Sequence, residues 1–312
     1  MNRIRKRLNP EERRAVLALI AEASDHDGIP PISEHVLLHL RHGGDKEDRH
    51  ILMHGPSQTQ GQTQIVGYAH LDLTDKVAGP SAELVIHPSE RGKGLGRALL
   101  AEILTVTSPR LWAHGDLLSA QKLARENGFI RVRTVAQMRR SLAEHLPKVK
   151  EELTLRTFLP GVDDEEWLAL NNSAFAGHPE QGNWDLSNLY DRVNENWFDA
   201  QGFILATQES KIIAYCWTKI HGGVAHSHDK KSAHAHDAIG EIYAVGVDPN
   251  FHGQGLGRAI TSAGLSHLRR KGLMSAMLYV DAENLAAISL YESLGFKEWG
   301  RDVMYRQPLP TN

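Results

Sequence analysis

The sequence predicts an α/β (α+β) fold class that is built twice in one chain, and three observations support this. A glycine-rich phrase at Arg91–Arg97 recurs at His252–Arg258. Each copy follows a short apolar run ending in proline, at Pro88 and at Pro249. Each copy is also followed, at nearly the same distance, by a Gly-Phe pair that ends a helical segment. A repeat of this length indicates tandem domains rather than a solenoid.

The composition is typical of a globular protein with two domains. The chain has 312 residues, of which 41% are hydrophobic and 23% charged, and its net charge of −3 argues against a general nucleic-acid binder. No apolar run approaches membrane-spanning length, and the basic stretch 1–7 is not followed by the apolar segment of a signal peptide. Cys216 is the single cysteine, which excludes an internal disulfide. We expect a cytoplasmic monomer that binds neither nucleic acid nor membrane.

The first half predicts helices and strands that alternate. Residues 11–23 have helical spacing, with Val16, Leu19 and Ile20 apolar, and Ser33 can cap a second helix. Helices are expected over 11–23, 33–40, 97–106 and 118–126. Runs with strand character occupy 51–53, 65–73, 82–86, 111–113 and 129–138. The segment 55–64 is polar and rich in glutamine, which favours an exposed loop.

The second half repeats this order after a charged segment that contains Pro147. We place a linker at 144–152 between an N-terminal domain, 1–143, and a C-terminal domain, 153–312. Strands are expected over 153–159, 203–207, 212–220, 242–247, 275–280 and 296–305, and helices over 163–175, 186–197, 257–270 and 286–293.

The two glycine-rich loops indicate phosphate binding. Glycine lets a turn bring its backbone N–H groups close to an anion, and the following helix adds its positive N-terminal end. No Lys-Ser/Thr pair follows the last glycine, so the loops do not match a P-loop. A dinucleotide fingerprint is also disfavoured, because several elements precede the first loop.

These loops resemble the acetyl-CoA motif of the GCN5-related N-acetyltransferases. The pattern Asn284, Ala287, Leu290-Tyr291 and Gly295-Phe296 is similar to a second motif of that family. His252 departs from the family, which usually has Gln or Arg there. The resemblance covers both halves and implies two tandem domains, each with a mixed, bulged central sheet flanked by helices. It also implies acetyl-CoA as co-substrate and no metal.

The resemblance further implies roles for individual residues. The strand before each loop would carry a bulge, so that freed N–H groups of Val245 and Val247 hold the acyl-CoA and polarise its thioester. Glu241 would be the base that takes the proton of the acceptor amine, and Tyr291 the acid that protonates the leaving thiolate. The implied acetyl-CoA contacts are Leu84, Val85, Ile86, Gly92, Lys93, Gly94, Leu95, Gly96 and Arg97 in the first half, and Val245, Gly246, Val247, His252, Gly253, Gln254, Gly255, Leu256, Gly257, Arg258, Asn284, Leu285, Ala286, Ala287, Ile288 and Ser289 in the second.

Comparison of the halves places the chemistry in the second one. Counted from the shared landmarks, Pro80 stands where Glu241 should be, Ala124 where Tyr291 should be, and Leu117 in place of Asn284. The first half thus keeps the CoA loop without either proton-transfer group. We expect it to bind CoA or to be a structural relic.

Further residues are similar to a branch of the family with two tandem domains and an active second one. The acceptor of that branch is a cysteinyl-glucosaminyl-inositol, a polyol with a free cysteine amine. The resemblance assigns its binding to Glu34, Glu180, Lys219, Glu241 and Tyr279. Glu34 lies in the first half, which implies an acceptor site at the domain interface.

Each of these assignments has an alternative. Glu241 can be a solvated strand-end carboxylate, Tyr291 a core tyrosine, and helix-start acids are common without function. The protein can instead acetylate another small amine or a protein N-terminus, or be an acyl-CoA sensor without turnover.

The histidine-rich segment 221–237 is irregular in spacing and favours a disordered insertion over a metal site. Cys216 lies in an apolar strand, where packing is favoured over reactivity.

Overall fold

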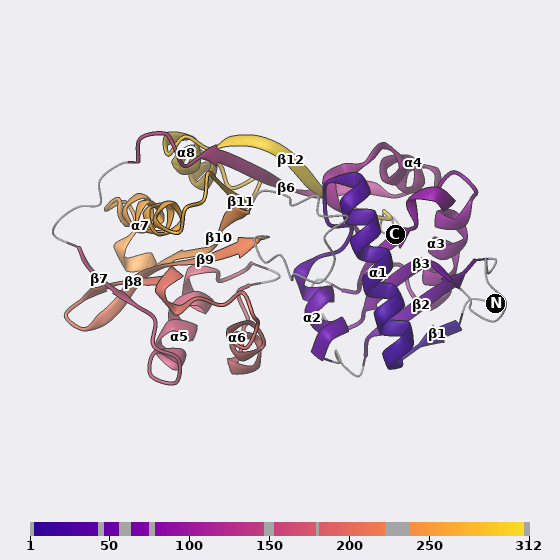
Figure 1. The fold of residues 1–312 in the computed structure, drawn as a ribbon, viewed down its shortest axis with the longest axis horizontal. Helices are drawn as coiled ribbons and strands as arrows, with labels where there is room; N and C mark the ends of the chain where they lie inside the picture. Colours follow the sequence, from indigo (N-terminus) through magenta and orange to yellow (C-terminus); the bar gives the residue numbers. More distant parts are fainter. Residues whose placement is uncertain are drawn as a thin grey trace, which may run out of the picture. The chain divides into compact units, whose positions relative to one another are not determined.

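The computed structural model describes residues 3–42, 47–55, 64–74, 79–146, 153–178, 181–221 and 238–308. The chain divides into two compact units, each a mixed sheet with helices on both faces (Figure 1). Unit 1 comprises 1–135 and 300–312, and unit 2 comprises 136–299. This confirms the predicted fold class of two α/β domains.

Unit 1 contains a sheet in the order β1-β2-β3-β4-β5-β12. The strands are β1 (Arg3–Arg5), β2 (Arg49–His54), β3 (Ile65–Asp72), β4 (Ser81–Ile86), β5 (Arg110–Ala113) and β12 (Lys297–Arg306). The helices are α1 (Pro10–Asp27), α2 (Glu34–His42), α3 (Leu95–Val106) and α4 (Leu118–Glu126), with the short 3₁₀ turns η1 (Pro88–Glu90) and η2 (His114–Asp116). β4 and β5 pair in parallel, whereas β1 to β4 pair antiparallel. Among the described α-helices and strands of this unit, β1 alone was absent from the predicted elements.

Two cores hold the helices of unit 1 on opposite faces of its sheet. One core joins α1 and α2 to Leu52, Tyr68 and Val85, and the other joins α3 and α4 to Ile51 and Ala69. Neighbouring strand residues thus face opposite cores, as the two-residue period of a strand requires.

Unit 2 repeats this architecture with the strand order β6-β11-β10-β9-β8-β7. The strands are β6 (Ile130–Ser141), β7 (Thr154–Thr157), β8 (Phe203–Gln208), β9 (Lys211–His221), β10 (Ile239–Val247) and β11 (Ser275–Asp281). The helices are α5 (Asp164–Ala174), α6 (Leu186–Val193), α7 (Leu256–Arg270) and α8 (Leu285–Ser293), with the 3₁₀ turns η3 (Ala200–Gly202) and η4 (Pro249–Phe251). An aromatic core that includes Trp167 and Trp217 covers the face of α5 and α6, and an aliphatic core that includes Ile242 and Ile260 covers the face of α7 and α8.

The compact units do not follow the boundary expected from the repeat. The C-terminal strand β12 crosses into unit 1, where Val303 pairs with Ala113 and Tyr305 with Leu111. Conversely, the second part of β6 belongs to unit 2, where Met138 enters the aliphatic core. Each unit is therefore completed by a strand from the other half of the sequence. The repeat could not indicate this, because a strand pattern does not specify the strand's partner.

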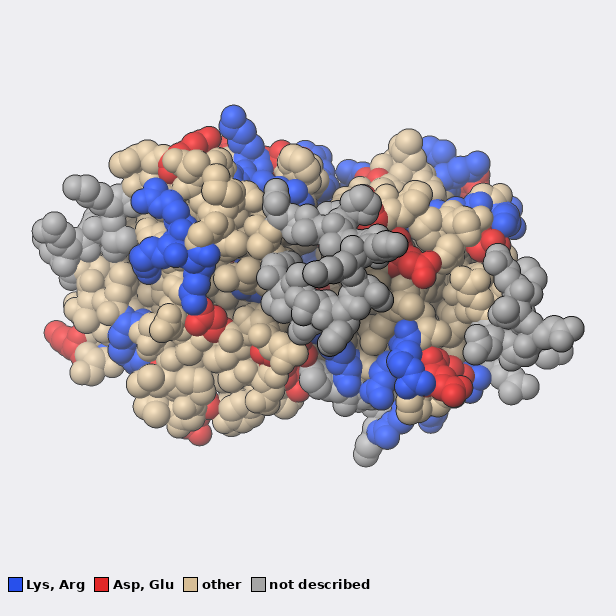
Figure 2. Space-filling view, in the orientation of Figure 1, with Lys and Arg blue, Asp and Glu red and all other residues tan. Residues whose placement is uncertain are grey.

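The described surface carries charges of both signs. Figure 2 shows Lys and Arg side chains interspersed with Asp and Glu side chains and uncharged surface on the face in view. Within the described residues, no helix has both the length and the apolar character needed to cross a bilayer.

Candidate active site

The two glycine-rich loops have the same backbone conformation. Gly92 and Gly94 have φ angles of 77° and 82°, and Gly253 and Gly255 have φ angles of 77° and 78°. Glycine alone adopts this left-handed region without steric cost. Each loop follows a 3₁₀ turn, η1 or η4, and leads directly into a helix, α3 or α7. The repeated phrase therefore builds the same loop twice.

Both loops end at a helix N-terminus that can hold an anion. The N-cap residues of α3 and α7 are Gly94 and Gly255, and among the described residues no side chain caps either helix. The first N–H groups of each helix have no intrahelical acceptor, and the helix dipole adds positive potential there. A pyrophosphate fits this arrangement of donors in both units.

The first residue of each loop anchors it to the preceding strand. Arg91 donates from Nε to the Ile86 carbonyl at 3.1 Å, and Nε2 of His252 lies 3.2 Å from the Val247 carbonyl oxygen. The Arg91 guanidinium also forms a bidentate ion pair with Asp27, with both distances 2.7 Å. His252 thus makes the same strand contact as the arginine, so this departure from the family motif leaves the loop anchored.

Each unit contains a split between the strand before the loop and its parallel neighbour. In unit 2, β10 pairs with β11 up to Glu241, which lies opposite Met277, and residues 242–247 then diverge from β11. In unit 1, β4 pairs with β5 up to Glu83, which lies opposite Trp112. The split begins further from the loop in unit 2, so the opening there is longer.

Backbone N–H groups of the diverging strands face these splits. Asp248 donates its N–H to β9 at 2.9 Å, and successive N–H groups along a strand point to opposite sides. The N–H groups of Val247 and Val245 therefore point away from β9, toward the split. In unit 1, His87 donates its N–H to β3. By the same alternation, the N–H groups of Leu84 and Ile86 point away from β3, toward the split.

The expected bulge is present before the second loop only. The register of β10 with β9 shifts between Ile242 and Ala244, so Tyr243 is the extra residue. β4 pairs with β3 in continuous register over residues 81–86, and the sheet of unit 1 has its register shift at Met53 instead. The prediction of a bulge before the first loop is therefore wrong, because β4 has no extra residue to splay it from β5.

Glu241 is buried beside two basic side chains. Its Oε2 lies 2.5 Å from Nε2 of His221, and Lys219 is its direct cross-strand partner on β9. Burial alone would raise the pKa of Glu241, but the hydrogen bond from His221 and the positive charges of His221 and Lys219 outweigh it and lower the pKa. Glu241 is therefore ionised at neutral pH and not a solvated strand-end carboxylate, since only 6% of its surface is exposed.

An aromatic surface lies next to Glu241. The Nζ atom of Lys219 lies 4.5 Å from the Trp197 ring centroid and 5.4 Å from that of Tyr243, the bulge residue. Arg192 donates from Nε to the Tyr243 hydroxyl at 2.6 Å. Packing against two rings orients the ammonium group beside the carboxylate.

Tyr291 lies on α8 against the opposite, aliphatic core. Its ring packs on Phe296 with a centroid distance of 6.0 Å. Burial raises the pKa of Tyr291 well above its ordinary value, with the neighbouring Cys216 adding to the shift, so the phenol keeps its proton at neutral pH. The Cys216 thiol is also buried, which raises its pKa to about 12 and makes it a packing residue.

Three other predicted site residues have structural contacts of their own. Asn284 caps α8 by accepting a hydrogen bond from the Ala287 N–H at 3.1 Å. Arg258 donates to the Ser293 hydroxyl at 2.6 Å, which connects the two helices beside the split. Tyr279, on β11 beyond its last pair with β10, has its hydroxyl 2.9 Å from the Gln137 amide nitrogen.

Unit 1 contains a buried carboxylate that the comparison of the halves missed. Counting from the loop selected Pro80, but the last residue of β4 paired with β5 is Glu83. Glu83 accepts hydrogen bonds from the Ser33 N–H at 2.5 Å and from Nε2 of His114 at 3.3 Å, and Nδ1 of His114 lies 3.2 Å from Asp302. Burial opposes the charge on His114, but Glu83 and Asp302 outweigh it and raise its pKa to about 10. This carboxylate is therefore held in a closed ion-pair network.

Two predicted acceptor residues, Glu34 and Glu180, stay predictions. Glu34 lies in the first turn of α2 in unit 1, and Glu180 is outside the described residues. Most of the histidine-rich segment, 222–237, is also outside them. Sequence reasoning assigned His221 to that segment, whereas it ends β9 and contacts Glu241. The cross-strand register of a hairpin could have indicated this pairing.

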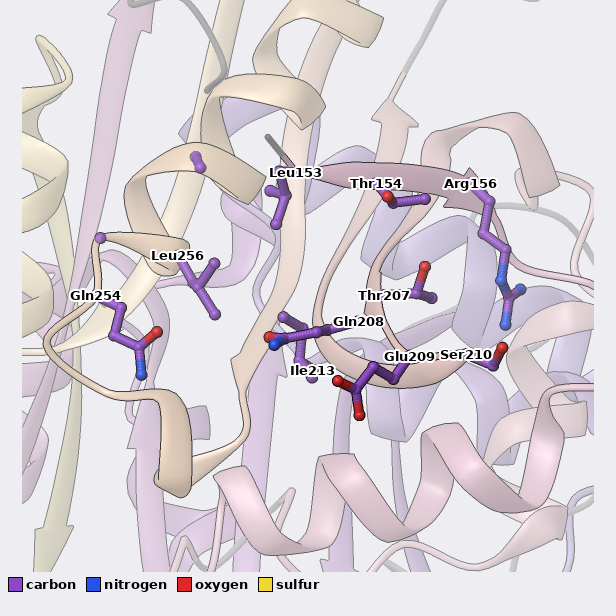
Figure 3. A pocket seen from close by; sticks show the side chains of 12 residues that line it. Leu153, Thr154, Arg156, Thr207, Gln208, Glu209, Ser210, Ile213, Gln254 and Leu256 are labelled. Carbon is purple, nitrogen blue, oxygen red and sulfur yellow. The ribbon is translucent and has the colours of Figure 1, made fainter. Parts of the chain in front are cut away.

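A hollow of about 810 Å³ lies beside the second loop (Figure 3). Gln254 and Leu256 of the loop face it from one side, and Thr154 and Arg156 of β7 face it from the other. The Arg156 guanidinium is already paired with Asp163 at 2.6 and 2.9 Å. Glu241 and Tyr291, which are predicted to transfer protons, are not among the residues that line this hollow.

Comparisons with known proteins agree with this geometry. Residues 165–296 match the model of the acetyltransferase (GNAT) family, and residues 58–131 match a second acetyltransferase (GNAT) domain. The chain is 49% identical to a mycothiol acetyltransferase of Acidothermus cellulolyticus, over 96% of this chain and 93% of that protein. It is 47% identical to that of Thermobispora bispora, over 98% and 99%.

Solved structures show the same fold. A GCN5-related N-acetyltransferase from Sphaerobacter thermophilus has a TM-score of 0.66 at 23% identity, covering 98% of this chain and 96% of its own. A tandem GNAT protein from the clavulanic acid biosynthesis pathway has a TM-score of 0.69 at 17% identity, covering both chains completely.

Proposed function

This chain belongs to the mycothiol acetyltransferase family and is an N-acetyltransferase, and from this premise we propose that unit 2 acetylates the cysteine amine of cysteinyl-glucosaminyl-inositol with acetyl-CoA. This would be the last step of mycothiol biosynthesis. The observation that carries the proposal is the composition of β10. β10 borders the longer split, has backbone N–H groups that point toward this split, and carries the buried, ionised Glu241.

The donor would lie along the split and the second loop. The uncapped N-terminus of α7 supplies N–H donors for the pyrophosphate. The N–H groups of Val245 and Val247 would hold the thioester carbonyl and stabilise the negative charge that develops on its oxygen. Acetyl-CoA supplies the activated acetyl group.

The proton transfers would use Glu241 and Tyr291, which lie on opposite faces of the sheet of unit 2. Glu241 accepts a proton from the acceptor ammonium, directly or through one water, and the neutral amine nitrogen then bonds to the carbonyl carbon. The carbon–sulfur bond breaks, and the Tyr291 hydroxyl donates its proton to the departing thiolate. The new amide nitrogen releases its extra proton to solvent, and solvent returns a proton to Tyr291. Lys219 and Tyr279 would hydrogen-bond the hydroxyls of the sugar and the inositol.

Substitution of Glu241 and Tyr291 tests these roles. In Glu241→Gln and Tyr291→Phe, turnover should fall by about 10²- to 10⁴-fold, the usual contribution of a positioned acid or base. The dissociation constant of acetyl-CoA should change only slightly, because neither side chain is among the residues assigned to the binding of acetyl-CoA. Stopped-flow thiol release and calorimetric titration with acetyl-CoA measure the two quantities. Near-normal turnover in both variants would exclude the assigned roles.

The acceptor is tested with a panel of amines. CoA release should be fastest with cysteinyl-glucosaminyl-inositol, compared with an aminoglycoside and with a peptide bearing a free N-terminus. Release at the buffer rate with every amine would favour an acyl-CoA sensor. Faster release with the peptide would favour a protein N-terminal acetyltransferase.

A further inference from the structure

A cluster of three potential metal ligands lies in unit 1, away from the loops and splits described above. The side chains are His39 on α2, Asp48 immediately before β2, and His70 on β3. Their ligand atoms all lie within 4.8 Å of one another. Three separate elements thus direct two imidazoles and one carboxylate to one point.

The distances fit the coordination shell of a small divalent ion. Oδ2 of Asp48 lies 2.8 Å from Nδ1 of His39 and 3.6 Å from Nε2 of His70. Nitrogen and oxygen ligands lie about 2.0–2.2 Å from zinc, so two ligands at a tetrahedral angle are about 3.3–3.5 Å apart. The two distances lie on either side of this separation, and side-chain shifts of less than 1 Å would bring both to it.

The buried side chain of His70 has a ring nitrogen without a hydrogen-bond partner among the described residues. The side chains of Asp48 and His70 are each 1% exposed. Among the described residues, Nε2 of His70 has no hydrogen-bond partner, since the carboxylate is beyond hydrogen-bond distance. A buried ring nitrogen without a partner is unfavourable, and a metal ion at this point would satisfy it.

We propose that His39, Asp48 and His70 bind a divalent transition metal ion, with zinc as the best match. Imidazole and carboxylate together suit zinc, whereas calcium and magnesium favour oxygen ligands alone. The His39 side chain is 14% exposed, so an ion can reach the cluster from the α2 side. A water would complete the coordination, or His35, whose ring centroid is 4.0 Å from that of His39 and whose Nε2 lies 3.3 Å from Asp72 Oδ2.

The site has a structural consequence that is separate from acetyl transfer. The ion connects α2 to β3 and to the residue that precedes β2 in unit 1. It therefore stabilises unit 1 without touching Glu241 or Tyr291, which belong to unit 2. The opposing interpretation is a histidine–aspartate–histidine ion-pair cluster that needs no metal.

The experiment uses the full chain with one set of background substitutions. The histidines of the segment 222–237 could also bind metal, so His226, His228, His234 and His236 are first replaced by Asn. The metal-stripped protein is titrated with Co²⁺, followed by its visible absorption bands, and with Zn²⁺ by calorimetry. His39→Gln, His70→Gln and Asp48→Asn are compared with His26→Gln, a matched change on the exposed end of α1.

The expected result is one bound equivalent in the background and in His26→Gln. Each cluster variant should lose it, with affinity falling by more than the roughly 10- to 100-fold caused by loss of an outer-shell partner. Zinc should raise the melting temperature of the background but not of His39→Gln. This partly exposed position is the deciding variant if His70→Gln does not fold.

Two outcomes overturn the proposal. The first is that the background protein binds neither Co²⁺ nor Zn²⁺. The second is that His39→Gln binds metal as tightly as His26→Gln. Acetyl transfer is measured only to verify folding, so failure of the metal site leaves the proposed function of unit 2 unaffected.

Discussion

The two units each place a buried glutamate paired with a histidine at the point where the parallel strands separate, but the pairs differ in what surrounds them. In unit 1, Glu83 is closed in by Ser33, His114 and a second carboxylate, Asp302. In unit 2, Glu241 contacts His221, and Lys219 lies opposite with its ammonium group held on aromatic rings. The same position thus serves as an ion-pair anchor in one unit and supplies a candidate base in the other.

The bulge contributes to this difference. With Tyr243 as the extra residue, β10 leaves β11 earlier, and the face next to Glu241 gains an aromatic surface. Without an extra residue, β4 remains paired with β5 up to Glu83, and the carboxylate is held by unit 1's own side chains. The bulge thus supplies one of the three additional positions between the last paired glutamate and the loop in unit 2, where Glu241 and His252 are 11 positions apart against 8 for Glu83 and Arg91.

The largest effect that would test this comparison is on stability. His114→Gln leaves Glu83 without its charged partner in a buried site, and loss of one partner of a buried ion pair costs about 3–5 kcal/mol. His221→Gln should cost far less, because the His221 side chain is 39% exposed. Urea unfolding of both variants at pH 7 measures the difference. Equal losses would show that the two pairs have the same role.

The contribution of His114 also has a predictable pH dependence. Its pKa is raised from 6.5 to about 10 in the folded protein, so its stabilisation is fully present below pH 6.5. It is lost progressively as the pH rises through 10. The stability gap between the wild type and His114→Gln should therefore narrow between pH 7 and pH 10, and a constant gap would contradict a charged His114.

A smaller effect is expected from a matched pair of loop substitutions. Gly92 and Gly253 both have φ near 77° with open space around an added Cβ. Valine at either position is strained by about 1–2 kcal/mol. Gly253→Val should raise the KM for acetyl-CoA about 5- to 30-fold, whereas Gly92→Val should leave steady-state kinetics unchanged. An equal rise in KM would mean that the first loop takes part in turnover.

The smallest effect concerns the pH profile of catalysis. His221 helps to lower the pKa of Glu241, so in His221→Gln burial acts with less opposition and the pKa rises. A base must be deprotonated, and the acidic limb of the kcat profile should therefore move to higher pH. His252→Gln serves as a control for loss of a histidine outside this pair. An unmoved acidic limb would show that Glu241 is not the titrating base.

The features of the site that could be predicted depend on residues that are close together in the sequence. The loops were predicted from glycine spacing, because Gly92, Gly94 and their repeats determine their own backbone conformation. Ser33 was predicted as a cap, and its hydroxyl lies 3.4 Å from the Val36 N–H. Both features depend on residues within a few positions of one another.

The features that were missed depend on distant contacts. Glu83 and Asp302 are far apart in the sequence and meet through His114, so counting from one landmark selected Pro80 instead. The bulge at Tyr243 is defined by its register with β9, which the sequence of β10 alone does not contain. His221 was counted as part of the histidine-rich segment, so its contact with Glu241 was not predicted.

The exchanged strands give the chain a fixed order of assembly during synthesis. β5 acquires its antiparallel neighbour only when Val303 to Tyr305 leave the ribosome, after all of unit 2 has been translated. Unit 1 is therefore translated early but completed late, and until then the β5 edge, including Leu111, has unpaired backbone groups that can pair with another chain. A nascent protein that stops before residue 300 lacks part of its first unit and not only of its last.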